Sequence, residues 1–187
     1  MTRPIEVTTT PLAGLLVVRR SPHRDERGSL DRIFDRTGHG AHGIDLVVAQ
    51  VNHTVTPHQG TVRGMHLQGP QAADVKLINC LRGRVFDVAV DLRAGSDTYL
   101  DWFGLVLDAE ESISLLVPEG VAHGHQALVD DCELLYIHGG PYETSAELGV
   151  RHDDPTIGID WPLSPIRVSD RDWAHPLVDP DGPGLGW

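Results

Sequence analysis

Cysteines are few in this chain, and long apolar runs are absent. The two cysteines, Cys80 and Cys132, cannot build a disulfide framework, and both lie in short apolar runs. We therefore expect two reduced cysteines in the core of a cytoplasmic protein. The N-terminal residues lack the apolar segment of a signal peptide, and no run approaches membrane-spanning length. We expect no association with a membrane.

Basic clusters and glycine-rich fingerprints are also missing. The formal net charge is -12, and no basic cluster exceeds pairs such as Arg19-Arg20, so we expect no nucleic-acid partner. No glycine-rich dinucleotide motif occurs, which argues against a nicotinamide cofactor. An anionic substrate would need a local basic pocket in this acidic chain. The basic residues that lie among the apolar runs, and could form it, are Arg27, Arg63, Lys76 and Arg93.

Lysine is nearly absent, because Lys76 is the only one among the 15 basic residues. Arginine stays charged and presents a planar fork, whereas lysine is a compact ammonium that can titrate when it loses solvent. A site that requires a small ammonium would explain the one lysine. Chance is an equally good explanation from this observation alone.

Helix-length periodic segments are missing from the central region, which instead shows short β-type runs separated by turn signals. This pattern in 187 residues predicts one domain (1–187) of the antiparallel all-β class, closed as a sandwich or jelly-roll barrel. The predicted strands are 14–20, 45–55, 75–81, 85–93, 102–108, 112–118, 125–129 and 132–138.

Two turns predict hairpins, and one C-terminal stretch predicts a short helix. Gly83 suits the positive-φ position of a tight hairpin, and Asp130-Asp131 marks a second one. Near the C-terminus, Ser169 is a candidate helix cap, with Asp172 at the third helical position.

The run 85–93 places Asp87, Ala89 and Asp91 on one face of a strand and apolar residues on the other. The small, acidic face could line a polar cavity inside a barrel. It could equally face solvent.

The segment 118–123 has the form Pro-x-Gly-x-x-His, which is the second signature of the cupin barrels. The first signature requires two histidines and a glutamate, but only His66 occupies the matching place. Because His66 and His123 are too few ligands, we expect a cupin barrel without a metal. Other histidines lie in loop-like surroundings and are expected at the surface: His39, His42, His58 and His152.

A metal-free pocket with histidine, lysine, carboxylate and tyrosine is suited to proton transfer. Histidine is the side chain best matched to removing a proton near neutral pH, and an ammonium can stabilise an enolate oxygen. These parts would perform epimerisation next to a ketone. The alternative from the residues alone is a core histidine, His66, with Lys76 extending its charge to solvent.

Several motifs resemble the dTDP-4-dehydrorhamnose 3,5-epimerase family, the RmlC-type cupin epimerases of sugar nucleotides. They occur in the family's order over roughly residues 10 to 180: DERG, VRGMHLQ, VKLINCLRGRVFDVAVDLR, LLVPEGVAHGHQAL, ELLY, DDPTIGIDWP and VSDRD. The resemblance implies a double-stranded β-helix (cupin) fold and a homodimer. It also implies a dTDP-4-keto-6-deoxyhexose as substrate, inversion at C3 and C5, and no cofactor.

The resemblance also implies roles for single residues. His66 matches the general base, Asp172 its carboxylate partner, and Tyr136 the general acid. Lys76 matches the lysine near the 4-keto oxygen. The residues that match positions holding the substrate or its phosphates are Arg27, Gln50, Asn52, Arg63, His123, Glu147 and Arg171. Arg63 and His66 are three apart, so both can enter one pocket only if a bulge or twist occurs at Gly64.

Four positions depart from the family's pattern. Leu67, His125 and Pro141 stand where the family commonly has aromatic residues, and Arg32 stands where it has a glutamate. These changes leave alternatives open: a single-carbon epimerase of a secondary-metabolite pathway, a 3,4-ketoisomerase, or a cupin that binds sugar nucleotides without turnover. A metal-dependent cupin oxygenase is the least favoured of them.

Overall fold

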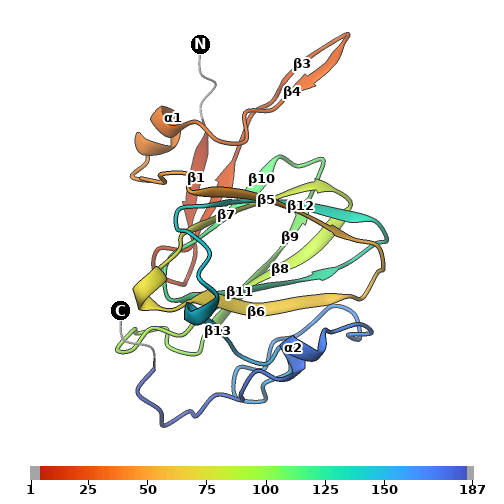
Figure 1. Cartoon of the computed structure of the whole chain (residues 1–187). Coiled ribbons are helices and arrows are strands. Elements are labelled where there is room, and N and C mark those ends of the chain that lie inside the picture. The colour runs from red at the N-terminus through yellow and green to blue at the C-terminus, as the bar shows by residue number, and fades with distance from the viewer. Residues whose placement is uncertain (1–4, 185–187) are drawn as a thin grey trace.

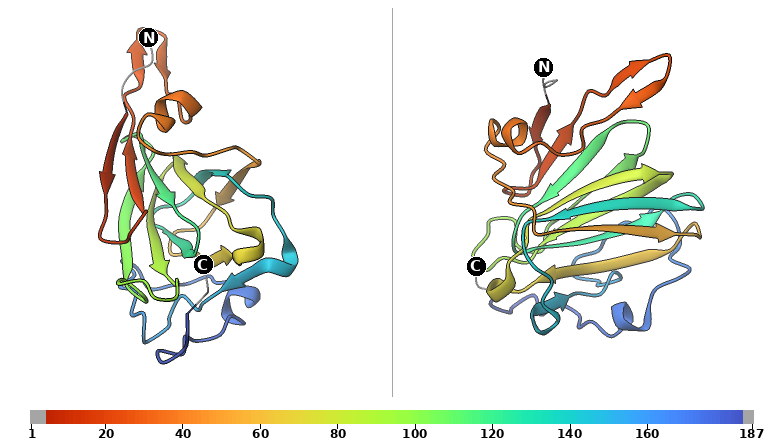
Figure 2. Two further views of the ribbon diagram at one scale, coloured as in Figure 1. Left: turned by 90° about the vertical axis from the view of Figure 1, so that its left-hand side faces the viewer. Right: turned by 45° about the horizontal axis from the view of Figure 1, so that its top comes forward.

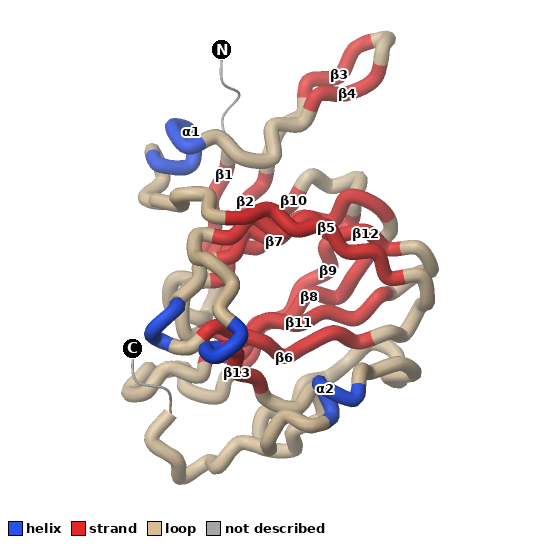
Figure 3. The backbone as a smooth tube through the Cα atoms, in the orientation of Figure 1, coloured by secondary structure: helices blue, strands red, loops and turns tan. Residues whose placement is uncertain are grey.

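Two antiparallel β-sheets face each other in this computed structural model, which describes residues 5–184 (Figures 1 and 3). The first sheet has the order β1 (Glu6–Thr9), β2 (Leu16–Arg19), β10 (Ile113–Val117), β7 (Lys76–Arg82), β12 (Cys132–His138) and β5 (Gln50–Thr56). The second has the order β13 (Glu147–Gly149), β6 (Val62–Gln68), β11 (Val121–Ala127), β8 (Arg84–Asp91) and β9 (Trp102–Asp108). The expected all-β cupin fold is confirmed.

The remaining elements are short. They are a hairpin of β3 (His23–Asp25) and β4 (Gly28–Leu30), the helices α1 (Arg36–Gly40) and α2 (Asp170–Trp173), and 3-10 turns at Pro70–Ala72 and Thr144–Ala146. The hairpin extends away from the two sheets in every view (Figures 1 and 2). Among the described residues, no helix is long and apolar enough to cross a membrane.

The short turns connect strands of opposite sheets, so the two predicted hairpins were wrong. β7 pairs with β10 and β12, whereas β8, which follows it, pairs with β9 and β11. Gly83 does adopt the expected positive φ of 75°. The turn at Asp131 likewise joins β11 of one sheet to β12 of the other. A turn signal marks where a strand ends, but it does not specify the next strand's partner.

Aliphatic side chains from both sheets fill one part of the space between them. Buried members include Leu15, Ile78, Leu107, Leu115 and Leu134, and the free cysteines Cys80 and Cys132 belong to the same cluster, as expected. Along β12, the face that carries Leu134 in this core continues with Tyr136 and His138, which line a cavity. The core therefore ends where the cavity begins.

Strand β8 is buried on both faces, which excludes the solvent-facing alternative. Asp87, Ala89 and Asp91 have no exposed surface, and Val88 and Val90 on the other face are covered as well. Asp87 hydrogen-bonds His123 of the cavity. Asp91 instead accepts hydrogen bonds from Arg93, Ser96 and Thr98 in the loop that follows β8. Of the two aspartates on this face, only Asp87 thus contacts a residue that lines the cavity.

The C-terminal helix α2 begins as predicted. The Ser169 side chain accepts a hydrogen bond from the backbone N–H of Asp172 at 3.1 Å, and Asp172 is the third helical residue. The helix packs against β6. This contact brings a residue from the end of the chain beside the strand that carries His66.

Two of the four histidines expected at the surface are buried. His39 and His152 are each 1 % exposed, whereas His42 and His58 are exposed as predicted. The His39 ring packs against Phe34, and the His152 ring packs edge-on against Trp173. Contacts with aromatic residues thus bury His39 and His152, although their polar sequence neighbours predicted exposure.

Candidate active site

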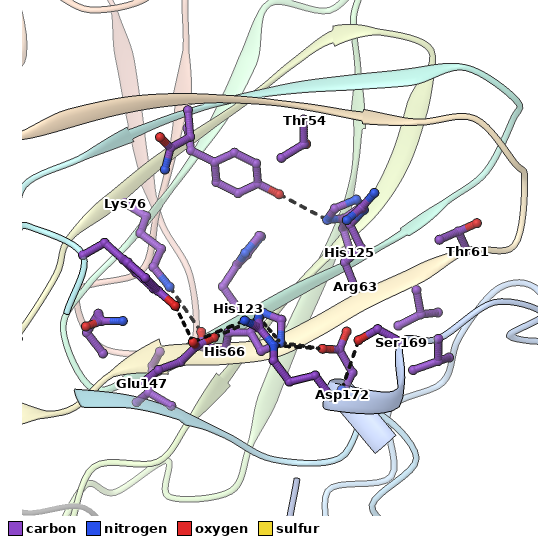
Figure 4. A pocket seen from close by; sticks show the side chains of 18 of the residues that line it. Thr54, Thr61, Arg63, His66, Lys76, His123, His125, Glu147, Ser169 and Asp172 are labelled. Atoms are coloured by element: carbon purple, nitrogen blue, oxygen red, sulfur yellow. Dashed lines mark hydrogen bonds and ion pairs between the residues drawn. The ribbon is translucent and has the colours of Figure 1, made fainter. Parts of the chain in front are cut away.

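A cavity of about 1310 Å³ lies between the two sheets, lined by β5 and β12 from one sheet and β6 and β11 from the other. It collects ten of the eleven predicted site residues: Gln50, Asn52, Arg63, His66, Lys76, His123, Tyr136, Glu147, Arg171 and Asp172. Figure 4 shows their side chains converging from both sheets.

His66 and Asp172 form a hydrogen-bonded pair in this cavity. His66 Nε2 lies 2.9 Å from Asp172 Oδ1, and the backbone N–H of Gly64 donates to Asp172 Oδ2 at 3.1 Å. Burial by itself raises the pKa of Asp172, but these hydrogen bonds outweigh it and hold the pKa well below its usual range. The charged carboxylate therefore fixes a proton on His66 Nε2, which leaves the Nδ1 lone pair as the base.

Arg63 and His66 enter the same cavity because the ladder is irregular between them. His66 lies opposite His123 and Arg63 opposite His125, with a register shift within that short stretch. Gly64 has a φ of 120°, and a Cβ there would lie 2.5 Å from Gly124 Cα. The expected irregularity at Gly64 is thus confirmed.

Lys76 reaches the pair from the opposite sheet. Its Nζ donates to the His66 carbonyl oxygen at 3.2 Å (Figure 4). Burial lowers the pKa of Lys76, while the nearby carboxylates Asp74 and Glu147 act in the opposite direction. A compact ammonium is thus held beside the candidate base.

Tyr136 also lies on the sheet opposite His66. Its Oη is 3.3 Å from His125 Nδ1, and its ring packs edge-on against His123. Burial raises the pKa of Tyr136, so the side chain carries its proton at neutral pH. A neutral phenol in this place can act as a proton donor.

Charged residues form a second group in the cavity. Arg171 and Glu147 make an ion pair at 2.8 Å, and the Tyr142 hydroxyl donates to Glu147 at 2.7 Å. Tyr142 lines the cavity, whereas Pro141, where the family commonly has an aromatic residue, is exposed and does not. The neighbouring tyrosine thus supplies an aromatic ring to this region.

Two predicted basic residues lie elsewhere. Arg27 is in the β3–β4 turn, 83 % exposed, bound to Asp25, and not among the residues that line the cavity. Arg93 is bound to Asp91 at 2.7 Å, also outside the cavity. The cavity arginines are the predicted Arg63 and Arg171 and one that was not predicted, Arg167.

Several cavity residues were missed by reasoning from sequence. Thr54 and His138 line it, and His138 Nδ1 is hydrogen-bonded to Asp74 at 2.6 Å. Both follow the two-residue alternation from predicted residues, Asn52 and Tyr136, which is a signal that could have found them. His175 is not among the residues that line the cavity, but its ring centroid is 5.4 Å from that of His66, and no sequence pattern indicates this contact.

One group of potential metal ligands exists among the described residues. His66, Asp172 and His175 offer donor atoms within 4.8 Å of one another. Their nitrogen and oxygen donors suit zinc in type. However, Asp172 already binds His66, and Arg171 Nη2 lies 3.5 Å from His66 Nε2, where its charge repels a cation. The expectation of a metal-free site remains a prediction.

This geometry is suited to moving protons on both sides of a bound molecule. The candidate base and its carboxylate belong to one side of the cavity, and the candidate acid belongs to the opposite sheet. The Lys76 ammonium, which lies 3.2 Å from the His66 carbonyl oxygen, can stabilise negative charge on an oxygen of that molecule. Deprotonation beside a carbonyl, with reprotonation from the other side, fits these positions.

Comparisons with known proteins identify relatives over most of the chain. Residues 9–179 match the family model described as dTDP-4-dehydrorhamnose 3,5-epimerase. The chain is 37 % identical to the dTDP-4-dehydrorhamnose 3,5-epimerase of Methanothermobacter thermautotrophicus, covering 88 % of this chain and 90 % of the relative.

Two solved structures are similar. The Bacillus anthracis dTDP-4-dehydrorhamnose 3,5-epimerase, with TDP and pyrophosphate bound, has a TM-score of 0.90, 31 % identity, and coverage of 93 % and 99 %. A 3′-monoepimerase from Streptomyces bikiniensis, in complex with dTDP-quinovose, has a TM-score of 0.82, 34 % identity, and coverage of 89 % and 85 %. The chain therefore belongs to the dTDP-4-dehydrorhamnose 3,5-epimerase family.

Proposed function

We propose that this chain is an epimerase that inverts C3 and C5 of a dTDP-4-keto-6-deoxyhexose, with residues 1–187 acting as one domain. The observation that carries the proposal is the His66–Asp172 pair, set across the cavity from a half-buried, protonated Tyr136. Family membership gives the substrate class.

The chemistry follows from the 4-keto group, which acidifies the hydrogens on both neighbouring carbons. His66 Nδ1 removes one of them, and Asp172 stabilises the resulting imidazolium. The ammonium of Lys76 stabilises the enolate oxygen. Tyr136 then protonates the carbon from the opposite face, which inverts it. The remaining cavity residues hold the nucleotide and restrict the sugar to a reactive pose. We propose this role for Gln50, Asn52, Arg63, His123, Glu147 and Arg171.

Proton NMR in D2O tests this proposal with dTDP-4-keto-6-deoxy-D-glucose as substrate. We expect the wild-type protein to remove both the H3 and H5 signals and to form product inverted at both carbons. His66→Ala should abolish both exchanges, because it removes the proposed base. Tyr136→Phe should retain exchange and lose inversion, since only reprotonation from the opposite face is impaired.

Other outcomes identify the alternatives. Loss of a single signal would indicate a one-carbon epimerase, and a ketone at C3 in the product would indicate a ketoisomerase. Tight binding of the nucleotide sugar without any exchange would indicate a binding protein. Each of these three results would contradict the proposed inversion at both carbons.

We also propose that the chain acts as a cytoplasmic homodimer in which Arg27 binds the substrate of the partner subunit. Arg27 cannot line its own cavity from the extended hairpin, yet it matches a family position that holds substrate. Val51 and Val55 on edge strand β5 are about half exposed, and apolar surface of this kind suits an interface between subunits.

Mixed dimers of Arg27→Ala and His66→Ala subunits separate this proposal from a role of Arg27 within its own subunit. If Arg27 acts on the partner's cavity, the mixed dimer contains one complete site and regains activity. If Arg27 acts only within its own chain, neither site is complete and the mixture stays inactive. Analytical ultracentrifugation checks the dimer itself, and a monomeric protein would contradict the proposal.

A further inference from the structure

His125 lies in the cavity but has no part in the mechanism above. It is on β11, 1 % exposed, at a position where the family commonly has phenylalanine. Figure 4 shows it in the upper half of the view with Thr54, above the His66–Asp172 pair. Its Nδ1 is 3.3 Å from Tyr136 Oη, and its Nε2 has no hydrogen-bond partner among the described residues. This histidine therefore touches the proposed acid.

The His125 ring is neutral over the whole physiological range. Burial lowers the pKa of His125 to about 3, and the nearby His123 and Arg63 act in the same direction. A neutral imidazole has one N–H and one lone pair, so it can donate from only one nitrogen. Which nitrogen carries the proton decides what His125 does to Tyr136.

The hydrogen bonds available to His125 favour a proton on its Nδ1. If Nε2 carried the proton, an N–H would be buried with no acceptor, which is the costly case for a polar group. If Nδ1 carries the proton, it donates to Tyr136 Oη. The phenol O–H is then free, but Tyr136 lines the cavity, so a bound molecule or water can accept from it. In the Nδ1–H form, both the His125 ring N–H and the Tyr136 O–H therefore have an acceptor.

We propose that His125 is a positioning residue for Tyr136: its Nδ1–H holds the phenol oxygen and leaves the phenol proton free for the substrate. The idea rests on the proposed function. In the step concerned, the enolate electron pair forms the new C–H bond with the phenol proton, and the O–H electron pair stays on Tyr136. The tyrosinate keeps the hydrogen bond from His125 until it takes a proton from water.

Two substitutions separate this role from packing. His125→Phe keeps a flat ring and removes the hydrogen bond, while His125→Asn keeps a donor near the position of Nδ1. In His125→Phe we expect inversion to fall roughly tenfold, while exchange of substrate hydrogen into D2O, which depends on His66, changes less than about twofold. His125→Asn should restore much of the inversion. A parallel fall of exchange and inversion, or full inversion in His125→Phe, would overturn the proposal.

A measurement without substrate keeps the inference independent of the proposed function. In protein labelled with ¹⁵N-histidine, two-bond ¹H–¹⁵N spectra report which ring nitrogen carries the proton. We expect His125 as the Nδ1–H form at neutral pH, with its Nδ1 resonance shifted in Tyr136→Phe. An Nε2–H form would contradict the proposal even if the enzyme is active. If the wild-type protein exchanges no substrate hydrogen, the proposed function fails, and this spectrum still tests the contact with Tyr136.

Discussion

At the scale of the residue, the account depends on the carboxylate of Asp172. It is 3 % exposed, accepts hydrogen bonds from His66 and Gly64, and has its pKa held low by them. A neutral amide of the same shape could keep the contacts but could not stabilise the imidazolium. It could also hold the wrong tautomer of His66 by accepting or donating at Nε2.

Asp172→Asn should therefore lower the rate of hydrogen exchange at the substrate carbon by about 10²- to 10⁴-fold with little change in fold. The rate is measured by NMR in D2O. Asp153→Asn is a matched control, because that carboxylate pairs with Arg151 outside the cavity and should not affect exchange. Equal rates in the two variants would show that His66 does not rely on Asp172.

At the scale of the element, strand β6 brings the site together through its irregularity at Gly64. Regular alternation would direct Arg63 and His66 to opposite faces. The positive φ of Gly64 and its close approach to Gly124 bring both side chains into the cavity, while its N–H holds Asp172. One glycine thus sets the positions of three site residues.

Gly64→Ala should destabilise the protein by more than about 2 kcal/mol, because a side chain is strained at this φ and meets the backbone of β11. The free energy of unfolding is measured with urea. Gly40→Ala serves as control, since a Cβ there meets nothing within 4 Å, and its effect should stay within about 1 kcal/mol. Similar stabilities of the two variants would refute this view of β6.

Strands were predictable from the sequence, but their partners were not. The ranges 102–108 and 132–138 match β9 and β12, since alternation and turn residues are local signals. The predicted hairpins at Gly83 and Asp131 failed because a turn between two sheets uses the same residue types as a turn within one sheet. The hydrogen bonds that choose between them involve strands far apart in sequence, such as β12 with β5.

At the scale of the whole molecule, acid stability should reflect its buried histidines. Burial lowers the pKa of His39, His125, His152 and His175. Each of these side chains is neutral in the folded protein and takes up a proton more readily when the chain unfolds. Protonation therefore favours the unfolded state.

For His125, the folded pKa of about 3 lies below the unfolded value of about 6.5. Its contribution is complete above pH 6.5 and is lost as the pH falls towards 3, by at most about 1.4 kcal/mol per pH unit. The free energy of unfolding of His125→Phe, relative to that of the wild type, should thus increase as the pH falls from 6.5 to about 4. It is measured by urea unfolding at each pH. His58→Phe, at an exposed position, should show no such trend. Parallel curves for all three proteins would contradict a buried, neutral His125.

The site was predictable to the extent that its motifs are local. Ten of eleven predicted residues line the cavity, and seven of the ten belong to a short motif in register with the family. The other three, Gln50, Asn52 and Glu147, lie outside those motifs and came from the match to family positions alone. Arg27 also had its motif, yet it lies in the extended hairpin and does not line the cavity of its own chain. His138 lies outside those motifs, and only its two-residue spacing from Tyr136 on β12 indicates its place in the cavity. His175 comes beside His66 through the path of the chain and has no local signal.

A crystal structure with an unreactive dTDP-6-deoxyhexose, reduced at C4, would show whether His66 and Tyr136 face opposite sides of the bound sugar ring. We expect the ring between His66 Nδ1 and Tyr136 Oη, each about 3–3.5 Å from the carbon to be inverted and on opposite faces of the ring. Lys76 Nζ should lie beside the oxygen on C4. A sugar bound with both side chains on one face, or outside the cavity, would contradict the account.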